Sequence, residues 1–238
     1  MKRYDILLMD ADETLFDFRR AEAEALRLTL EEFGIDCTPE VETLYSGINS
    51  ALWKAFERGE VTKPFLKKAR FTQLFEQLNI AEGGEEAAER YPIHLGEASY
   101  PLPGAEELCR LLSEMGCRLC LTTNGISYVQ HRRLDKSPLK KYFSEENVFV
   151  SEDIGSQKPQ IEYYQFIFEK IGSLSHDRIL AVGDSLSSDI KGGINAGVDT
   201  CWYNPDGADS GDVHPTYDIR TLDELLRVVD PECEAHLA

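Results

Sequence analysis

Residues 6–14 read ILLMDADET, in which four apolar residues run directly into two aspartates that flank one alanine. A short, continuously apolar run of this kind is typical of a strand buried inside a parallel sheet. Similar runs precede Thr122, Ser151 and Gly183. In an open parallel sheet, ligands bind outside the carboxyl ends of the strands, so we expect four polar segments to converge on one crevice. Those segments are DADET (10–14), LTTNG (121–125), QKP (157–159) and GDSLSSD (183–189).

From residue 100 onward, helical and strand patterns alternate along the chain. Such alternation predicts an α/β fold, a Rossmann-like parallel sheet with helices on both faces. Residues 204–215 are rich in Pro, Gly and Asp, and we expect a loop there. The expected strands cover residues 6–9, 117–122, 147–150, 178–182 and 200–203, and the expected helices cover residues 105–115, 127–135, 159–171, 187–196 and 222–229.

Residues 17–99 show helical periodicity and no strand pattern. Thr38 and Thr62, each followed closely by proline, are expected helix caps. A further helix is expected from Glu85 to Ser99, and Pro92 is expected to kink or end it. The pattern predicts an all-helical insert of the four-helix-bundle type after the first strand. The expected domains are an α/β core (residues 1–16 and 100–238) and the helical insert (residues 17–99).

The chain carries 43 acidic and 25 basic side chains, a formal charge of −18. Such a surface repels nucleic-acid backbones and anionic lipids, so we expect a small-molecule substrate and neither a nucleic-acid polymer nor a membrane as partner. The six cysteines show no disulfide framework and the N-terminus shows no signal peptide, which favours a reduced, cytoplasmic setting. We also expect a monomer or a weak homodimer. Cys117 and Cys120 are expected on opposite faces of a strand, packed in the core rather than bound to zinc.

Asp10 and Asp12 lie where the first strand ends, and the chain can turn there so that both carboxylates approach one reacting atom. This arrangement suits one carboxylate as nucleophile and the other as general acid and base. Thr123 and Asn124 follow a strand and precede a helix, where hydroxyl, amide and backbone N–H groups can bind phosphate oxygens. The ammonium of Lys158 is expected to lean over the same crevice.

Asp184 lies at the tip of an apolar strand and Asp189 about one turn later, and both offer hard oxygen ligands that suit Mg²⁺. Two like charges roughly 4 Å apart repel by about 4 kcal/mol at an effective dielectric constant of about 20. At least three carboxylates are expected to face a phosphate dianion here. Lys158 and a divalent ion together are the smallest addition that makes this crevice attractive to phosphate.

The four segments resemble the four motifs of the haloacid dehalogenase superfamily, in their usual order, and the insert is similar to that family's helical C1 cap. By this resemblance, Asp10 is the nucleophile that forms an aspartyl-phosphate, and Asp12 protonates the leaving group and then activates water. Thr123, Asn124 and Lys158 hold the phosphate. The resemblance implies that Mg²⁺ is bound by Asp10, Asp184 and the main-chain carbonyl of Asp12, with Asp189 supporting the metal or Lys158.

Three longer segments narrow the resemblance: DADETLF (10–16), SALWKAFERGEVT (50–62) and GGINAGVDTCWYNP (192–205) resemble the YjjG-type pyrimidine 5′-nucleotidases of bacteria. That resemblance implies hydrolysis of nucleoside 5′-monophosphates such as UMP, dUMP and dTMP. The insert should then select the substrate, and Asn49, Trp53 and Arg70 are candidates to contact the base. The alternative is that the aromatic residues pack the bundle and Arg70 lies on a solvated face.

Other functions remain open from the residues alone. One is a sugar-phosphate phosphatase or phosphomutase of the same fold. Another is a signalling or binding protein that is phosphorylated on aspartate, although receiver domains of that class are about half as long and lack a helical insert. Dehalogenases proper lack the second aspartate and need no metal, so Asp12 and Asp184 argue against carbon–halogen chemistry.

Overall fold

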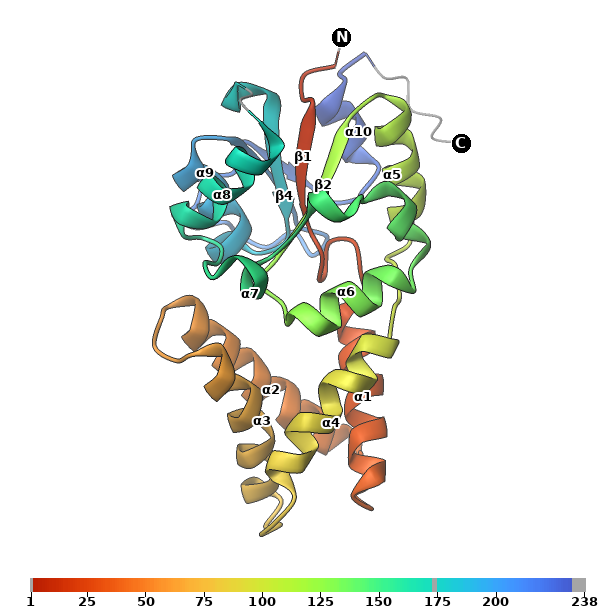
Figure 1. Cartoon of the computed structure of the whole chain (residues 1–238), viewed down its shortest axis with the longest axis vertical. Helices are drawn as coiled ribbons and strands as arrows, with labels where there is room; N and C mark the ends of the chain where they lie inside the picture. The colour runs from red at the N-terminus through yellow and green to blue at the C-terminus, as the bar shows by residue number, and fades with distance from the viewer. Residues whose placement is uncertain (1, 173–174, 233–238) are drawn as a thin grey trace.

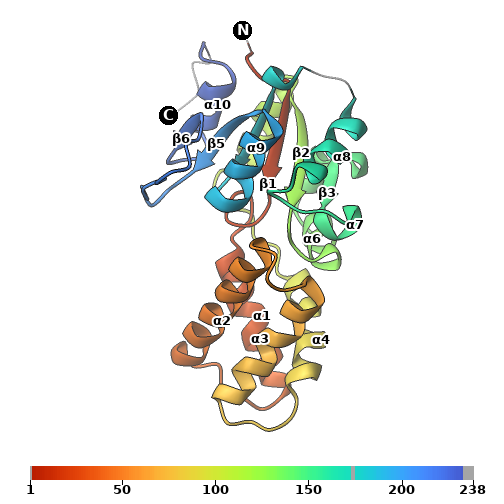
Figure 2. The ribbon, with the colours of Figure 1, turned by 90° about the vertical axis from the view of Figure 1, so that its left-hand side faces the viewer.

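The computed structural model describes residues 2–172 and 175–232. A parallel sheet with helices on both faces forms the upper part in Figure 1, and a helical bundle lies below the carboxyl ends of the strands. The view in Figure 2 also places the bundle under this edge of the sheet. None of the described helices is long and apolar enough to cross a membrane.

Within the described residues, six strands form one parallel sheet in the order β3-β2-β1-β4-β5-β6. Every residue of β1, Ile6–Asp10, is buried, in accord with its uninterrupted apolar run. Asp10 pairs with Thr122 of β2, and Met9 pairs with Val182 of β4, so these strands end level at one edge. The parallel α/β fold expected from the sequence is confirmed. The other strands are β2 (Arg118–Thr123), β3 (Val148–Val150), β4 (Ile179–Gly183), β5 (Asp199–Tyr203) and β6 (Tyr217–Ile219).

Alternate residues of β1 face opposite layers of helices. Leu7 and Met9 pack in a cluster with α5 and α10, whereas Ile6 and Leu8 pack in another with α8. Figure 1 shows α5 and α10 on one side of the sheet and α8 and α9 on the other. The helices of this part are α5 (Ala105–Glu114), α6 (Ser127–Asp135), α7 (Ser151–Ile154), α8 (Ile161–Ile171), α9 (Lys191–Ala196) and α10 (Glu224–Val229), with 3₁₀ turns at Pro138–Tyr142, Glu145–Asn147 and His176–Arg178 and a π-helical turn at Leu186–Ile190.

The bundle is made of α1 (Phe18–Glu32), α2 (Pro39–Glu57), α3 (Lys63–Gln77) and α4 (Gly84–Glu97). The side chains of Thr38 and Thr62 accept hydrogen bonds from the first turns of α2 and α3, with proline in each first turn. Tyr45, Phe71 and Tyr91 pack at the centre, with ring centroids 5.1 to 5.5 Å apart. The expected helical insert is therefore held by its own aromatic core.

Three local expectations differ from the structure. The helix does not end at Pro92, since α4 continues to Glu97 with its neighbouring turns buried in the bundle, and the alternative of a kink at Pro92 stays a prediction. The helix expected from Pro159 begins two residues later, at Ile161, after a turn at the Lys158 segment. Strand β6 was not expected, because three residues carry too little periodicity to distinguish a strand from a loop.

The chain crosses between the sheet and the bundle twice, and the two crossing segments lie side by side. The N–H of Asp17 donates to the carbonyl of Tyr100 at 2.8 Å, and that of Leu102 donates to Leu15 at 2.9 Å. Helix α6 also packs on the bundle. We propose that these crossings divide a core domain (residues 1–16 and 100–238) from a cap domain (residues 17–99).

The cysteines in the described residues are free thiols. Cys117 lies in the cluster that includes α5 and α10, and Cys120 lies in the cluster that includes α8. They are therefore buried on opposite faces of the sheet, as the odd offset predicts. Cys233 lies outside the described residues.

Candidate active site

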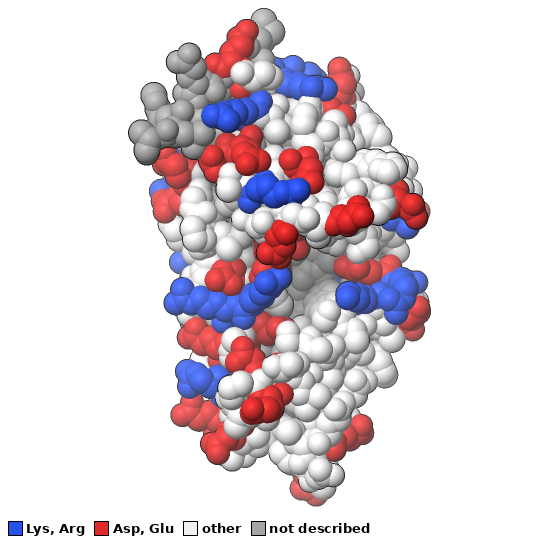
Figure 3. Space-filling model, turned by 180° about the vertical axis from the view of Figure 1, so that it is seen from behind, with Lys and Arg blue, Asp and Glu red and all other residues white. Residues whose placement is uncertain are grey.

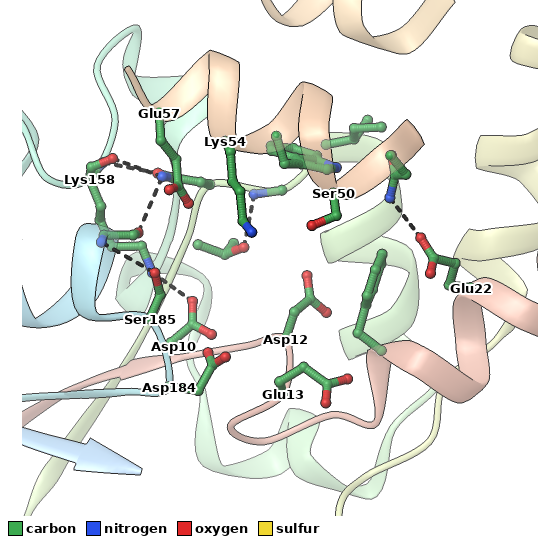
Figure 4. Close-up of a pocket in the computed structure, with 18 of the residues that line it drawn as sticks. Asp10, Asp12, Glu13, Glu22, Ser50, Lys54, Glu57, Lys158, Asp184 and Ser185 are labelled. Carbon is green, nitrogen blue, oxygen red and sulfur yellow. Dashed lines mark hydrogen bonds and ion pairs between the residues drawn. The ribbon is translucent and has the colours of Figure 1, made fainter. Parts of the chain in front are cut away.

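A cavity of about 430 Å³ lies between the carboxyl edge of the sheet and the helical bundle. All four predicted segments reach it, through Asp10, Thr123, Lys158 and Asp184 among others. Figure 4 shows Asp10 and Asp184 side by side near Lys158, with Asp12 pointing into the same space. The structure thus brings the polar ends of separate strands to one place. Figure 3 shows the hollow between the two parts from the back of the molecule.

Lys158 is the electrostatic centre of the core side of the cavity. Its side chain is only 2% exposed, and its ammonium donates to Asp10 Oδ1 at 2.6 Å, Asp189 Oδ1 at 2.6 Å and the Thr122 carbonyl at 2.9 Å. Three acceptors match the three donors of a lysine ammonium. Lys158 therefore holds Asp10 and Asp189 in fixed positions at the end of the sheet.

The close approach of Asp189 depends on a glycine at the end of β4. A Cβ atom at Gly183 would lie 2.2 Å from Asp189 Oδ2, so no other residue fits without displacement of this carboxylate. The same oxygen accepts a hydrogen bond from the N–H of Ser185 at 3.1 Å. The GDSLSSD segment therefore folds back on itself and presents its second aspartate to Lys158.

The carboxyl groups repel one another in this buried place. Burial, followed by the charge of Asp189, raises the pKa of Asp10 well above its ordinary value, although Lys158 opposes the shift. Burial raises the pKa of Asp184 to about 8, again with Asp189 as the next cause. One lysine faces three carboxyl groups whose oxygens lie within 4.8 Å of one another. A further cation would relieve this repulsion.

The donor set fits a hard divalent ion. Asp189 has both oxygens engaged, by Lys158 and by the Ser185 N–H, whereas Asp10 and Asp184 lie together at the cavity. Mg²⁺ retains several waters and is commonly bound through only one or two carboxylates. Asp10 and Asp184 therefore suit direct ligation, and Asp189 suits the support of Lys158.

Asp12 is held by two residues that the sequence did not single out. Its Oδ1 accepts from Arg133 Nη1 in an ion pair, and its Oδ2 accepts from Gln130 Nε2 at 2.7 Å. Both donors lie on α6 and both are buried. Their spacing of three residues places them on one helix face, which is the sequence signal that could have identified them. The Arg133 Nε also donates to the Ala98 carbonyl, at 3.1 Å, and so reaches the second crossing segment.

The LTTNG segment lines the cavity through Thr123, Asn124 and Gly125, and it also supports Lys158. The Asn124 side chain donates to the Lys158 carbonyl at 2.8 Å and accepts from the Lys158 N–H at 2.9 Å. This amide therefore positions Lys158, and the expected contact of Asn124 with phosphate stays a prediction. Thr123 Oγ1 accepts from the Gly125 N–H at 3.0 Å, and its hydroxyl hydrogen remains free to donate.

The bundle side contributes cations as well. Lys54, on α2, points into the cavity toward the aspartates (Figure 4). Lys63, at the start of α3, donates to the carbonyls of Asn124 and Gly125 at 2.8 and 3.1 Å and to Ser151 Oγ at 2.9 Å. Burial lowers the pKa of Lys63 to about 8. Lys63 thus ties the bundle to the LTTNG segment.

The three bundle residues expected to contact a base all line this cavity. Asn49 and Arg70 are buried, so Arg70 does not lie on a solvated face, and Trp53 is half-buried against Phe56. Asn49 Nδ2 donates to Glu22 Oε1 at 2.6 Å, and Asn49 Oδ1 accepts from Arg70 at 3.5 Å. Glu22 was not expected, because an acidic residue on an amphipathic helix usually faces solvent.

Comparison with known proteins assigns the chain to a family. A model of haloacid dehalogenase-like hydrolases matches residues 4–197. The chain belongs to this family. As a haloacid dehalogenase-like hydrolase, the protein is an enzyme, and this family is generally Mg²⁺-dependent.

Relatives in the same family match nearly the whole chain. The HAD hydrolase YfnB of Bacillus subtilis is 41% identical, with 98% of each chain covered. Its magnesium-bound crystal structure superposes with a TM-score of 0.90 over 96% of this chain and 100% of the other. The pyrimidine 5′-nucleotidases PynA of Streptococcus pneumoniae and YjjG of Escherichia coli are 38% and 33% identical, cover 95% of this chain, and are themselves covered over 95% and 98% of their lengths.

Proposed function

We propose that the protein is a Mg²⁺-dependent phosphomonoesterase that acts through an aspartyl-phosphate, with pyrimidine nucleoside 5′-monophosphates as preferred substrates. The observation that carries the proposal is the single cavity shared by Asp10, Asp12, Lys158 and Asp184 at one end and by bundle residues at the other. The names of PynA and YjjG support the substrate class.

In the proposed first step, a carboxylate oxygen of Asp10 attacks phosphorus and the bond from phosphorus to the ester oxygen breaks. Asp12 delivers its proton to the departing oxygen, through Oδ2, while Oδ1 can keep the hydrogen bond from Arg133. The positive charge of Lys158 offsets the negative charge of the phosphoryl oxygens, and the Thr123 hydroxyl donates a hydrogen bond to one of them.

In the second step, Asp12 takes a proton from a water molecule, which attacks the phosphorus of the aspartyl-phosphate. Inorganic phosphate leaves and Asp10 is restored as a carboxylate. The ion pair with Arg133 suits both steps, because it keeps the Asp12 carboxyl group at the cavity.

Asp10, Asp184 and the main-chain carbonyl of Asp12 would hold the Mg²⁺, while Asp189 stays with Lys158. When bound, the ion offsets the negative charge of the carboxylates and of the substrate phosphate. Without that charge, the described cavity offers a phosphate dianion an acidic surrounding.

The charge of the chain bears on the kind of substrate and partner that we propose. Acidic side chains are spread over the face shown in Figure 3, with basic ones among them. The formal charge of −18 supports a small phosphate monoester over a nucleic-acid polymer or an anionic membrane. We propose a cytoplasmic monomer or weak homodimer.

A panel of phosphomonoesters with Mg²⁺ tests the proposal. We expect UMP, dUMP and dTMP to give higher kcat/KM values than purine nucleotides and hexose phosphates. Equal or faster hydrolysis of the sugars would reject the nucleotidase and leave a sugar-phosphate phosphatase or phosphomutase. Stable phosphorylation of Asp10 without turnover would instead indicate the signalling alternative.

A further inference from the structure

Arg70 of α3 is a buried cation with unused donors. Its side chain is 1% exposed, and its guanidinium lies 4.4 Å from the ring centroid of Tyr91, which holds it in place. Nη1 donates to Asn49, but within the described part of the chain neither Nε nor Nη2 has a hydrogen-bond partner. Buried charged donors are rarely left unpaired, because the lost hydration is not replaced. Since Arg70 lines the cavity, its free donors suit a bound ligand.

Glu22 of α1 is the matching buried acceptor. It is 8% exposed, and its oxygens accept from Asn49 at 2.6 Å and from Ser46 at 3.0 Å. Both of these hydrogen-bond donors are uncharged, and burial raises the pKa of Glu22, although the charge of Arg70 opposes the shift. Each carboxylate oxygen can accept a further hydrogen bond. Glu22 and Arg70 thus face one cavity, joined through Asn49, with both charges left incompletely neutralised.

The position of this cluster suits the far end of a nucleotide. Figure 4 shows Glu22 on the opposite side of the cavity from Lys158, with Asp12, Lys54 and Ser50 between them. Apolar side chains also line the cavity and could pack against the planar ring of a base. They are Phe18, Trp53, Leu95, Ile126 and Val129. A ligand whose phosphate lies at Lys158 would therefore extend its other end toward Glu22.

We infer that Glu22, Asn49 and Arg70 form a base-recognition subsite for the lactam edge of uracil or thymine. Glu22 accepts the ring N3–H, and Arg70 and the Asn49 amide donate to the flanking carbonyl oxygens. The three side chains thus offer one acceptor and two donors to an edge that carries one donor and two acceptors. Cytosine, whose N3 lacks hydrogen, places an acceptor against Glu22. The inference rests on the proposed function and adds the base it selects.

The first test needs no variant. We expect the wild-type enzyme to hydrolyse UMP with a kcat/KM about 100-fold above that for N3-methyl-UMP, because a site built around a substrate N–H strongly rejects an analogue that lacks it. CMP should also be slower than UMP. Equal kcat/KM values for UMP and N3-methyl-UMP, with nucleotides still preferred to sugars, would overturn this inference alone. Faster hydrolysis of ribose 5-phosphate than of UMP would overturn the proposed function as well.

Two variants test whether Glu22 and Arg70 distinguish UMP from N3-methyl-UMP. In Glu22→Gln and Arg70→Met, the ratio of kcat/KM between UMP and N3-methyl-UMP should fall by about tenfold or more. Glu31→Gln is the matched control, because Glu31 lies on the same helix, pairs with Arg27 at the surface and does not line the cavity. Its ratio should match the wild type. A ratio that stays unchanged in both cavity variants would contradict the assignment, even if the substrate test succeeds.

Discussion

At the scale of single residues, the chemistry depends on how each carboxylate is held. Asp10 and Asp189 share Lys158, whereas Asp12 is bound by Arg133 and Gln130. Two aspartates only two positions apart therefore lie in different electrostatic surroundings. Such a separation suits a nucleophile and an acid-base group, since each role requires a different protonation state.

The substitution Arg133→Gln tests the positioning of Asp12. We expect kcat to fall by about 10- to 100-fold, because a small displacement of a catalytic group is costly, while KM changes little. Steady-state kinetics with UMP measure the split between kcat and KM. The matched control is Arg132→Gln, since Arg132 is the neighbouring arginine of α6 and pairs with Glu97 at the surface. Equal losses in the two variants would show that Arg133 acts through the stability of α6 alone.

The sequence indicates the residues of the core motifs because each follows a strand. Asp10, Thr123 and Asp184 can be identified from the apolar runs before them. Glu22 and Arg133 could not be identified in this way, since each lies on a helix where charged residues are ordinarily solvated. Their burial results from packing between α1, α2, α3 and α6, which no local pattern reports.

At the scale of elements, a buried lysine joins α3 to the segments that follow β2 and β3. Lys63 donates to two carbonyls and a serine of the core. Periodicity predicted the helices and the strands around them, but the start of α8, strand β6 and the continuation through Pro92 required tertiary contacts. A short element contains too few residues for its hydrophobic periodicity to be recognised, so its conformation depends on tertiary contacts.

Lys63 should give the protein a measurable pH dependence. Burial lowers its pKa from 10.5 to about 8, so the folded chain releases this proton before the unfolded chain does. Stability therefore rises between these pH values, by about 1–3 kcal/mol relative to Lys63→Met. Urea unfolding at about pH 7.5, below the folded pKa, and at about pH 10, close to the unfolded pKa, measures the difference in the free energy of unfolding. The exposed Lys68→Met should show no such trend, and a parallel pH profile for wild type and Lys63→Met would contradict the assignment.

At the scale of the whole molecule, an acidic protein must attract an anionic substrate. The formal charge of −18 opposes the approach of a phosphate, and the cavity itself contains more carboxylates than lysines at its core end. Local cations therefore decide whether a phosphate binds. The net charge and the carboxylates of the four segments predicted this requirement, but the lining of the cavity comes from the placement of the bundle over the sheet edge.

Removal of the metal should affect both activity and stability. We expect a chelator to abolish turnover, and Mg²⁺ at about 100 times its Kd to stabilise the folded protein by about 2.7 kcal/mol. The variant Asp184→Asn should lose most of this gain in thermal unfolding. Asp206→Asn, an exposed carboxylate in the loop after β5, is the control and should keep it. Full activity in excess chelator would contradict the role of the ion.

The central claim is that Asp10 captures a phosphoryl group, and rapid quenching with phosphate-labelled UMP tests it most directly. We expect label on the peptide that contains Asp10, with formation and decay at least as fast as kcat, and no label in a folded but inactive Asp10→Asn variant. Turnover without any protein-bound phosphate, or label on another residue, would contradict the account.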